Sequence, residues 1–248
     1  MSDYKKSCEE QFFKLLKEVK FDKKFLSENE TRLIYIFKRI YVINLLKNRV
    51  ELNTIFDENF EESFSLLLET TFSLFSGQYR ASLLLLRTTL ESVLKFITIK
   101  EREFIKSKNP LVTFEKIDYR FSDTKRKLLN DIGNNIYRYP DYSQTIEKSV
   151  TYYKNLSSVV HSVNKKKLLS FSSFYLDLQD ETLVEKEYFF KLHTDTLNNI
   201  FTLLFFLSRK KFKNWDTYDL QNILKVMFKK ENQIKKYMNY VKLSPYNP

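Results

Sequence analysis

The sequence predicts an all-α protein, a helical bundle with additional helices at both ends of the chain. Two observations predict this class. First, apolar residues recur at helical spacing along most of the 248 residues. Second, the chain contains 2 glycines, Gly77 and Gly133, where average usage of roughly 7% would give about 17. Because hairpins and bulges depend on glycine, this scarcity argues against a turn-rich β architecture.

Four helices are expected before residue 100. Near the N-terminus, apolar residues repeat at i, i+3, i+4 and i+7, the stripe of an amphipathic helix: Phe12, Leu15, Leu16 and Val19. Further stripes predict helices over about 28–46 and 58–75, and Gly77 marks the break that follows. The helix over about 79–100 is the most apolar of the four, so we expect it at the centre of the bundle.

Turn signals divide the second half of the chain. Asn109-Pro110 ends any continuation of the fourth helix, because a residue before proline disfavours helical geometry. Residues 107–121 are expected to form a loop, and a short helix from Ser122 is expected to end near Gly133. Tyr139-Pro140-Asp141 predicts another turn. Helices are then predicted over about 143–161, 182–208, 217–229 and 231–241, with a strand or extended segment at 168–178.

The net charge of +11 is concentrated at the two ends of the chain. Residues 1–50 carry net +5 and residues 201–248 net +7, whereas residues 51–200 carry net −1. The simplest partition is a bundle domain over 1–208 and a basic helical appendage over 209–248. A basic surface favours nucleic acid or an anionic membrane. The alternative explanation is AT-rich coding, which the many Lys, Asn, Ile, Phe and Tyr residues also indicate.

Composition excludes several classes of function. So few glycines leave no Gly-rich phosphate loop, no dinucleotide fingerprint and no nucleophile elbow. The single cysteine, Cys8, excludes an internal disulfide and a multi-cysteine zinc site, and we expect no metal and no cofactor. The N-terminus lacks the apolar region of a secretory signal, and no apolar run approaches the ~20 residues of a membrane span. We therefore expect a protein of the reducing cytoplasm.

Charged residues interrupt the most apolar helix. Their spacings of seven, four and four place them on one helical face: Arg80, Arg87, Glu91 and Lys95. Arg87 and Glu91 can pair directly, since a charged residue in such a helix is usually paired when it is buried. Two interpretations stay open, an ordinary exposed pair or an arginine that its glutamate holds in a cleft.

A polar stripe lies at the end of the helix predicted over 143–161. Its members stand at i, i+3, i+4 and i+7: Lys154, Ser157, Ser158 and His161. The dipole at a helix C-terminus favours the protonated form of His161, which suits a proton carrier near neutral pH. The alternative is a histidine that caps its helix or packs in the core.

Two segments together resemble bacterial HEPN-type proteins. Residues 79–91 contain an LR-x-x-L-E pattern, and about 60 residues later residues 152–161 contain Y-x-x-LS-x-x-VH. The likeness covers roughly residues 60–165 and implies a four- or five-helix bundle that commonly dimerises, found among toxins and anti-phage defence effectors. In its catalytic members an Arg, four to six further residues and a His form a metal-independent ribonuclease site. Here Lys154 stands where that Arg is wanted, which keeps the charge but loses the planar phosphate fork.

The resemblance implies a division of roles if the chain cleaves RNA. His161 would take the proton of a 2′-OH or donate one to the leaving 5′-oxygen, while Lys154 or Arg87 stabilises the phosphate charge. Glu91 would hold Arg87. Arg80, Ser157 and Ser158 would bind the nucleic acid. The alternative is a non-catalytic helical adaptor that binds a protein partner or nucleic acid.

The C-terminal appendage interleaves cations with aromatic residues, a mixture that suits single-stranded nucleic acid. Its candidate binding residues are Arg209, Lys210, Lys211, Lys213, Lys235 and Lys236. The alternatives are a solvated helical face whose aromatics turn into the core and, less favoured, a membrane-surface role. The partners expected are RNA or another nucleic acid, a second copy of the chain as a homodimer, and a protein encoded nearby.

Overall fold

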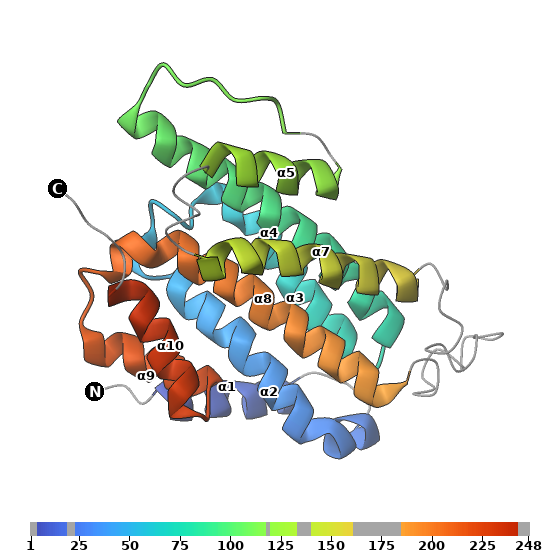
Figure 1. Ribbon diagram of the computed structural model, residues 1–248. Coiled ribbons are helices and arrows are strands. Elements are labelled where there is room, and N and C mark those ends of the chain that lie inside the picture. The colour runs from blue at the N-terminus through green and yellow to red at the C-terminus, as the bar shows by residue number, and fades with distance from the viewer. Residues whose placement is uncertain (1–3, 19–22, 118–119, 133–139, 161–184, 243–248) are drawn as a thin grey trace. The chain divides into compact units, whose positions relative to one another are not determined.

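The computed structural model describes residues 4–18, 23–117, 120–132, 140–160 and 185–242 (Figure 1). Within these ranges every regular element is a helix and no strand occurs, which confirms the all-α class. The chain divides into two compact units. We call residues 1–56 and 208–248 the terminal unit, and residues 57–207 the central unit.

The terminal unit brings the two ends of the chain together. It contains α1 (Tyr4–Glu18), α2 (Lys23–Lys47), a short 3-10 helix η1 (Val50–Leu52), α9 (Thr217–Met227) and α10 (Glu231–Lys242). Helix α9 packs against α1 and α2, and α10 packs against α9. The guanidinium of Arg49 donates to the Asp219 carboxylate at 2.7 Å, and the hydroxyl of Tyr4 donates to the same carboxylate at 2.7 Å. Residues more than 160 positions apart therefore share one polar cluster.

The central unit is built around one long helix. It contains α3 (Glu58–Phe75), α4 (Tyr79–Lys108), α5 (Phe121–Ile132), α7 (Pro140–Val160) and residues 186–207 of α8 (Lys186–Phe212). Helix α4 contacts α3, α5 and α7, as expected of the helix predicted at the centre of the bundle. Its apolar residues from Leu83 to Ile97 include a series that is fully buried: Leu83, Leu86, Leu90, Val93, Leu94 and Ile97.

A glycine turn joins α3 to α4. Gly77 adopts a positive φ of 76°. Its N–H donates to the carbonyl of Leu74 at 3.0 Å, and the N–H of Gln78 donates to that of Ser73 at 2.9 Å. These two bonds form a Schellman motif, which satisfies carbonyls that the end of a helix leaves open. The predicted break at Gly77 is thereby confirmed.

Several predicted boundaries differ from the structure. Helix α2 begins at Lys23 rather than near residue 28, α5 begins at Phe121 so that Ser122 lies inside it, and α8 ends at Phe212 rather than near residue 208. Helix α4 continues to Lys108 instead of ending near residue 100, and it stops at Asn109, the residue before Pro110. Where the extension begins, the buried Lys100 ammonium is ion-paired with Asp57 at 2.6 Å. A paired charge can stay inside a helix that packs on both sides. The predicted turn at 139–141 is wrong for Pro140 and Asp141, which begin α7. Proline suits the first helical position, where its missing N–H is not needed.

Other expectations concern residues that the structure does not describe. The extended segment predicted at 168–178 and the helix end at Gly133 lie outside the described residues. The predicted division into a bundle domain over 1–208 and a basic appendage over 209–248 stays a prediction. In the contacts that the structure records, residues 208–248 group with residues 1–56. No helix in the described ranges is long and apolar enough to cross a membrane.

The α3–α4 turn yields a first prediction. Replacing Gly77→Ala forces a Cβ into the left-handed region, which costs roughly 1–2 kcal/mol of folding free energy. No heavy atom lies within 4 Å of the position that the Cβ would occupy, so backbone strain is the expected cause. Urea unfolding should show this loss for Gly77→Ala and a smaller loss for Gly77→Asn, because asparagine tolerates positive φ better. Equal stability of Gly77→Ala and the wild type would contradict the assignment.

Candidate functional site

Helices α4 and α7 are joined by a direct side-chain contact at Arg87. Its Nη2 donates a hydrogen bond to the hydroxyl of Tyr153 at 2.5 Å, across a sequence separation of 66 residues. The guanidinium carbon lies 4.7 Å from the centroid of the same ring. On α5, the ring of Phe121 stacks on Tyr153 with centroids 4.1 Å apart and an interplanar angle of 10°. Three helices thus fix the position of one arginine.

The charged row on α4 pairs differently from the prediction. Glu91 forms its ion pair with Lys95 at 3.2 Å, one helical turn further on. Arg87 turns toward α7 instead, because the Tyr153 hydroxyl offers an acceptor in the interface between the helices. Among the described residues, no hydrogen-bond partner reaches the buried Nε of Arg87. The arginine is therefore held by a tyrosine rather than by its glutamate. Arg80, the second residue of α4, is exposed.

The polar stripe predicted on α7 contains residues in different surroundings. Lys154 is exposed, so its ammonium faces solvent. The hydroxyl of Ser158 donates to the carbonyl of Asn155 at 2.7 Å, within its own helix. The Oγ of Ser157 is buried, and none of the described residues hydrogen-bonds to it. His161, the residue proposed to carry protons, lies outside the described residues.

The structure brings together Arg87, Tyr153 and the α7 segment that contains Lys154 and Ser157. In the sequence, Tyr153 stands out only as the first residue of the Y-x-x-LS-x-x-VH pattern, and nothing marks Phe121 as a functional residue. The usable signal was the spacing of four residues between Tyr153 and Ser157, which places both on one helical face. A contact with Arg87 could not be read from local spacing.

The phenol beside Tyr153 is also perturbed. Burial raises the pKa of Tyr152, and the negative charge of Asp195 on α8 raises it further. Both causes favour the neutral phenol, so Tyr152 stays protonated well above neutral pH. It can therefore donate a hydrogen bond but does not act as a general base under physiological conditions.

A buried serine–histidine pair lies elsewhere in the central unit. His193 of α8 is 0% exposed, and its Nε2 lies 3.1 Å from the Oγ of Ser82 on α4. The Ser82 hydroxyl also donates to the carbonyl of Thr70 at 3.2 Å, and the tautomer of the His193 ring decides which of Ser82 and His193 donates to the other. Because both residues are completely buried, this contact joins α4 to α8 and gives no substrate access to a nucleophile.

The other nucleophile to consider is Cys8 in the terminal unit. It is buried in α1. Burial raises the pKa of its thiol to about 12, although the charge of Lys38 acts in the opposite direction. The reactive thiolate is therefore scarce at neutral pH. In the described part of the chain, no group of three or more His, Cys, Asp or Glu side chains is arranged to hold a metal ion.

The basic residues of the C-terminal segment divide by exposure. Arg209 is only 4% exposed and is not accessible to a ligand, which corrects its place among the candidates. The remaining candidates are exposed: Lys210, Lys211, Lys213, Lys235 and Lys236. Several aromatic residues between them pack inward, since Tyr237 stacks on Phe228 with centroids 4.9 Å apart and Phe212 is buried, whereas Tyr218 is exposed. These lysines form a solvated face, and those buried rings are not free to stack on bases.

Comparisons with protein-family models, with curated proteins and with solved structures found no match to this chain. The evidence for the candidate site therefore consists of the contacts between its own residues. Its centre is the contact between Arg87 and Tyr153, with Phe121 behind the tyrosine ring.

The contact predicts a measurable loss of stability on Tyr153→Phe. This change keeps the ring that stacks on Phe121 and removes the acceptor of a charged donor, a loss of roughly 1–3 kcal/mol in unfolding free energy. Tyr218→Phe, at an exposed tyrosine of α9, is the matched control and should change stability by less than about 0.5 kcal/mol. Similar effects of the two changes in urea unfolding would mean that the hydrogen bond from Arg87 to Tyr153 contributes nothing to the free energy of unfolding.

Proposed function

We propose that the chain is a HEPN-like protein of a bacterial toxin or anti-phage defence system that acts on RNA. Its site is centred on the contact between α4 and α7. The observation that carries this proposal is the hydrogen bond from Arg87 to Tyr153. It joins the two segments on which the resemblance depends, although about 60 residues separate them in the sequence. A site composed from both segments requires that they meet.

In this proposal Arg87 binds the phosphate that is cleaved. A guanidinium carries five N–H donors in a planar fork, and Tyr153 accepts one of them. The Tyr153 ring and hydroxyl orient the guanidinium, so less of its freedom is lost when a phosphate binds. Lys154 is exposed on the adjacent helix and supplies a second cation.

His161 is the proposed proton carrier. In the sequence it stands four residues after Ser157 and eight after Tyr153, the spacing of one helical face. It takes the proton of the RNA 2′-OH as that oxygen forms a bond to phosphorus. The bond from phosphorus to the 5′-oxygen breaks, and the leaving oxygen takes a proton from water. His161 then returns the proton that it holds to the solvent. Arg87 stabilises the charge that develops on the phosphate, and the products are a 2′,3′-cyclic phosphate and a 5′-OH.

Incubation with total RNA in the presence of EDTA tests this chemistry. The wild-type protein should produce fragments that end in a cyclic phosphate, and His161→Ala should lower the rate by roughly 10²–10⁴-fold, the usual contribution of an acid–base group. Arg87→Lys should also lower the rate, because lysine lacks the planar fork. Its matched control, Arg126→Lys at an exposed arginine of α5, should not.

The outcome that refutes catalysis is equally definite. Identical cleavage patterns from wild type and His161→Ala, with unchanged melting temperatures, would assign the cleavage to a contaminant. Absence of cleavage by wild type would leave the non-catalytic candidate described next.

The second candidate function is a non-catalytic adaptor that holds nucleic acid. A specific observation favours it, because the residue at the expected arginine position is Lys154, and its side chain is exposed to solvent. The exposed lysines near the end of α8 also offer a binding surface: Lys210, Lys211 and Lys213. In this version RNA binding is electrostatic and does not depend on His161.

Salt dependence of RNA binding tests the adaptor. For a single-stranded oligonucleotide, each phosphate contact contributes about −0.7 to the slope of log K against log salt. Changing Lys210, Lys211 and Lys213 to Gln should make the slope shallower by up to about 2, whereas His161→Ala should not change it. The matched control changes three exposed lysines of the central unit to Gln: Lys106, Lys108 and Lys116. Binding without salt dependence would contradict this function.

A further inference from the structure

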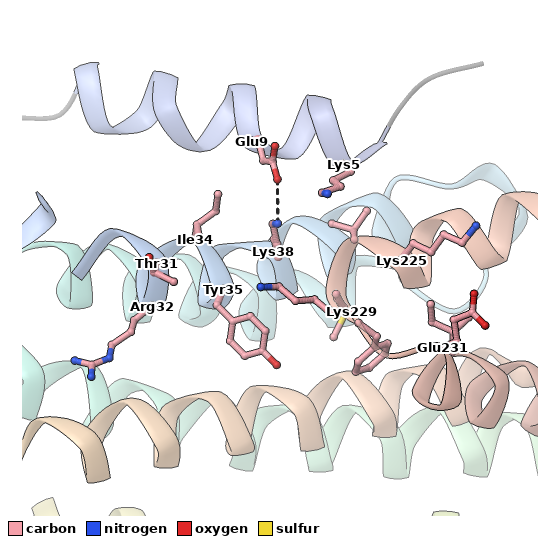
Figure 2. Close-up of a pocket in the computed structure, with 14 residues that line it drawn as sticks. Lys5, Glu9, Thr31, Arg32, Ile34, Tyr35, Lys38, Lys225, Lys229 and Glu231 are labelled. Atoms are coloured by element: carbon pink, nitrogen blue, oxygen red, sulfur yellow. Dashed lines mark hydrogen bonds and ion pairs between the residues drawn. The ribbon is translucent and has the colours of Figure 1, made fainter. Parts of the chain in front are cut away.

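The terminal unit contains a cavity of about 810 Å³. Its walls come from α1, α2, the end of α9 and the start of α10, so all of them belong to one unit (Figure 2). Pockets that hold small molecules and cofactors usually measure about 300–1,000 Å³. The volume is therefore sufficient for a ligand with an aromatic ring system and several phosphates.

Positive charge predominates around this cavity. Five cations line it, Lys5, Arg32, Lys38, Lys225 and Lys229, against two carboxylates, Glu9 and Glu231. The carboxylate of Glu9 forms an ion pair with the Lys38 ammonium at 3.1 Å, which Figure 2 marks with a dashed line. In the described ranges no carboxylate lies within ion-pair distance of Lys225 or Lys229. The cavity thus has a surplus of cations, as a site for a polyanion requires.

The cations surround the cavity rather than cluster at one point. Figure 2 shows Arg32 and Lys225 at opposite ends of the group of side chains, with Lys229 between them. They arise from two segments almost 200 residues apart, α2 and the segment from α9 to α10. A ligand with several anionic groups can contact cations from both segments, whereas a single small anion cannot.

Apart from Thr31, the remaining lining is apolar or aromatic, and it includes one exposed aromatic ring. Val226, Met227, Phe228 and Ile234 are buried, while Tyr35 is 37% exposed. The guanidinium of Arg39, itself 0% exposed, lies 3.7 Å from the Tyr35 ring centroid and donates to the Tyr35 carbonyl. This contact restrains the tyrosine ring. A restrained, exposed ring beside cations is the arrangement on which nucleobases stack.

The first turn of α10 adds to the attraction for anions. Glu231 and Ile234 of this turn line the cavity. The helix starts after Lys230, whose carbonyl accepts from the N–H groups of Gln233 and Ile234. A lysine side chain contains no acceptor, so Lys230 does not cap the free N–H groups of the turn with its own side chain. The positive end of the helix dipole therefore attracts anions, although the carboxylate of Glu231 in the same turn offsets part of that attraction.

We propose that this cavity binds a nucleoside di- or triphosphate. Its base stacks on Tyr35 against the apolar wall, and its phosphates contact Lys225, Lys229 and Arg32. A free phosphate would make no contact with the apolar wall, and an uncharged nucleoside would form no ion pairs with the cations. This binding site belongs to the terminal unit and is independent of the proposed RNA chemistry of α4 and α7, so either can fail alone.

Isothermal titration calorimetry with the full chain in 0.15 M salt tests the proposal. The probes are ATP, GTP, adenosine, inorganic tripolyphosphate and a short oligoribonucleotide. ATP or GTP should bind with a dissociation constant in the micromolar range, at least about tenfold more tightly than adenosine or tripolyphosphate, since one such factor corresponds to a single good interaction. Lys225→Gln combined with Lys229→Gln should weaken nucleotide binding by about tenfold or more.

Two further variants distinguish binding in the cavity from nonspecific attraction of a polyanion to a basic protein. Lys14→Gln combined with Lys17→Gln removes the same charge from exposed lysines of α1 that do not line the cavity, and it should leave nucleotide affinity within about twofold. Tyr35→Leu keeps an apolar side chain but removes the ring, so it should weaken ATP while tripolyphosphate binding stays unchanged. Unchanged melting temperatures without ligand show that each variant folds, and the single change Lys225→Gln replaces the double variant if it does not.

Several results would overturn the proposal. One is the absence of heat with both nucleotides. Another is equal affinity for ATP and tripolyphosphate, which would leave Tyr35 and the apolar wall without a role. Equal losses in the two double lysine variants would show that only net charge matters. Binding of the oligoribonucleotide without any binding of free nucleotide would assign the surface to RNA instead.

Discussion

The arrangement of the central unit depends on the polar side chains of α4. They find hydrogen-bonding or ion-pair partners on every helix that surrounds α4. Each neighbour supplies at least one partner: Ser63–Ser92 from α3, Arg102–Asp131 from α5, Arg87–Tyr153 and Glu101–Tyr142 from α7, and Ser82–His193 from α8. A long helix with leucines on most sides can pack in several rotations at similar apolar burial. Buried polar groups must find partners, so only one rotation satisfies all of these contacts. This constraint directs Arg87 to α7 and thereby creates the candidate site.

The elements of the fold could be predicted because their causes are local. Helical spacing, the glycine at Gly77 and the proline after Asn109 act within one or two turns, and the structure has helices and boundaries there. What failed was the choice of partner. A spacing of four residues favours an ion pair between Arg87 and Glu91. It gives no information about Tyr153, which approaches Arg87 from α7, 66 residues away in the sequence. Burial of Arg209 escaped prediction for the same reason, since a run of basic residues gives no sign of which one faces inward.

Scarcity of glycine has a chemical consequence in both units. Without backbone loops that approach a ligand closely, recognition has to come from side chains on helix faces and from helix ends. The Arg87–Tyr153 contact is of this kind, and so is the cavity lined by Tyr35, Lys225 and Lys229. The cavity was invisible in the sequence because α2 and α9 contribute to it from opposite ends of the chain. Net charge located the basic segments, but only tertiary structure shows that their cations surround an apolar wall.

Photo-cross-linking to RNA that contains 4-thiouridine, followed by peptide mass spectrometry, tests the central claim most directly, because it reports where RNA lies without requiring cleavage. An RNA site at the contact between α4 and α7 predicts cross-linked peptides from residues 79–91 and 140–165, lost on competition with unmodified RNA and reduced by Arg87→Lys. Additional cross-links in the terminal unit are compatible with the exposed lysines there. Cross-links confined to the terminal unit, with none in either α4 or α7, would contradict the account.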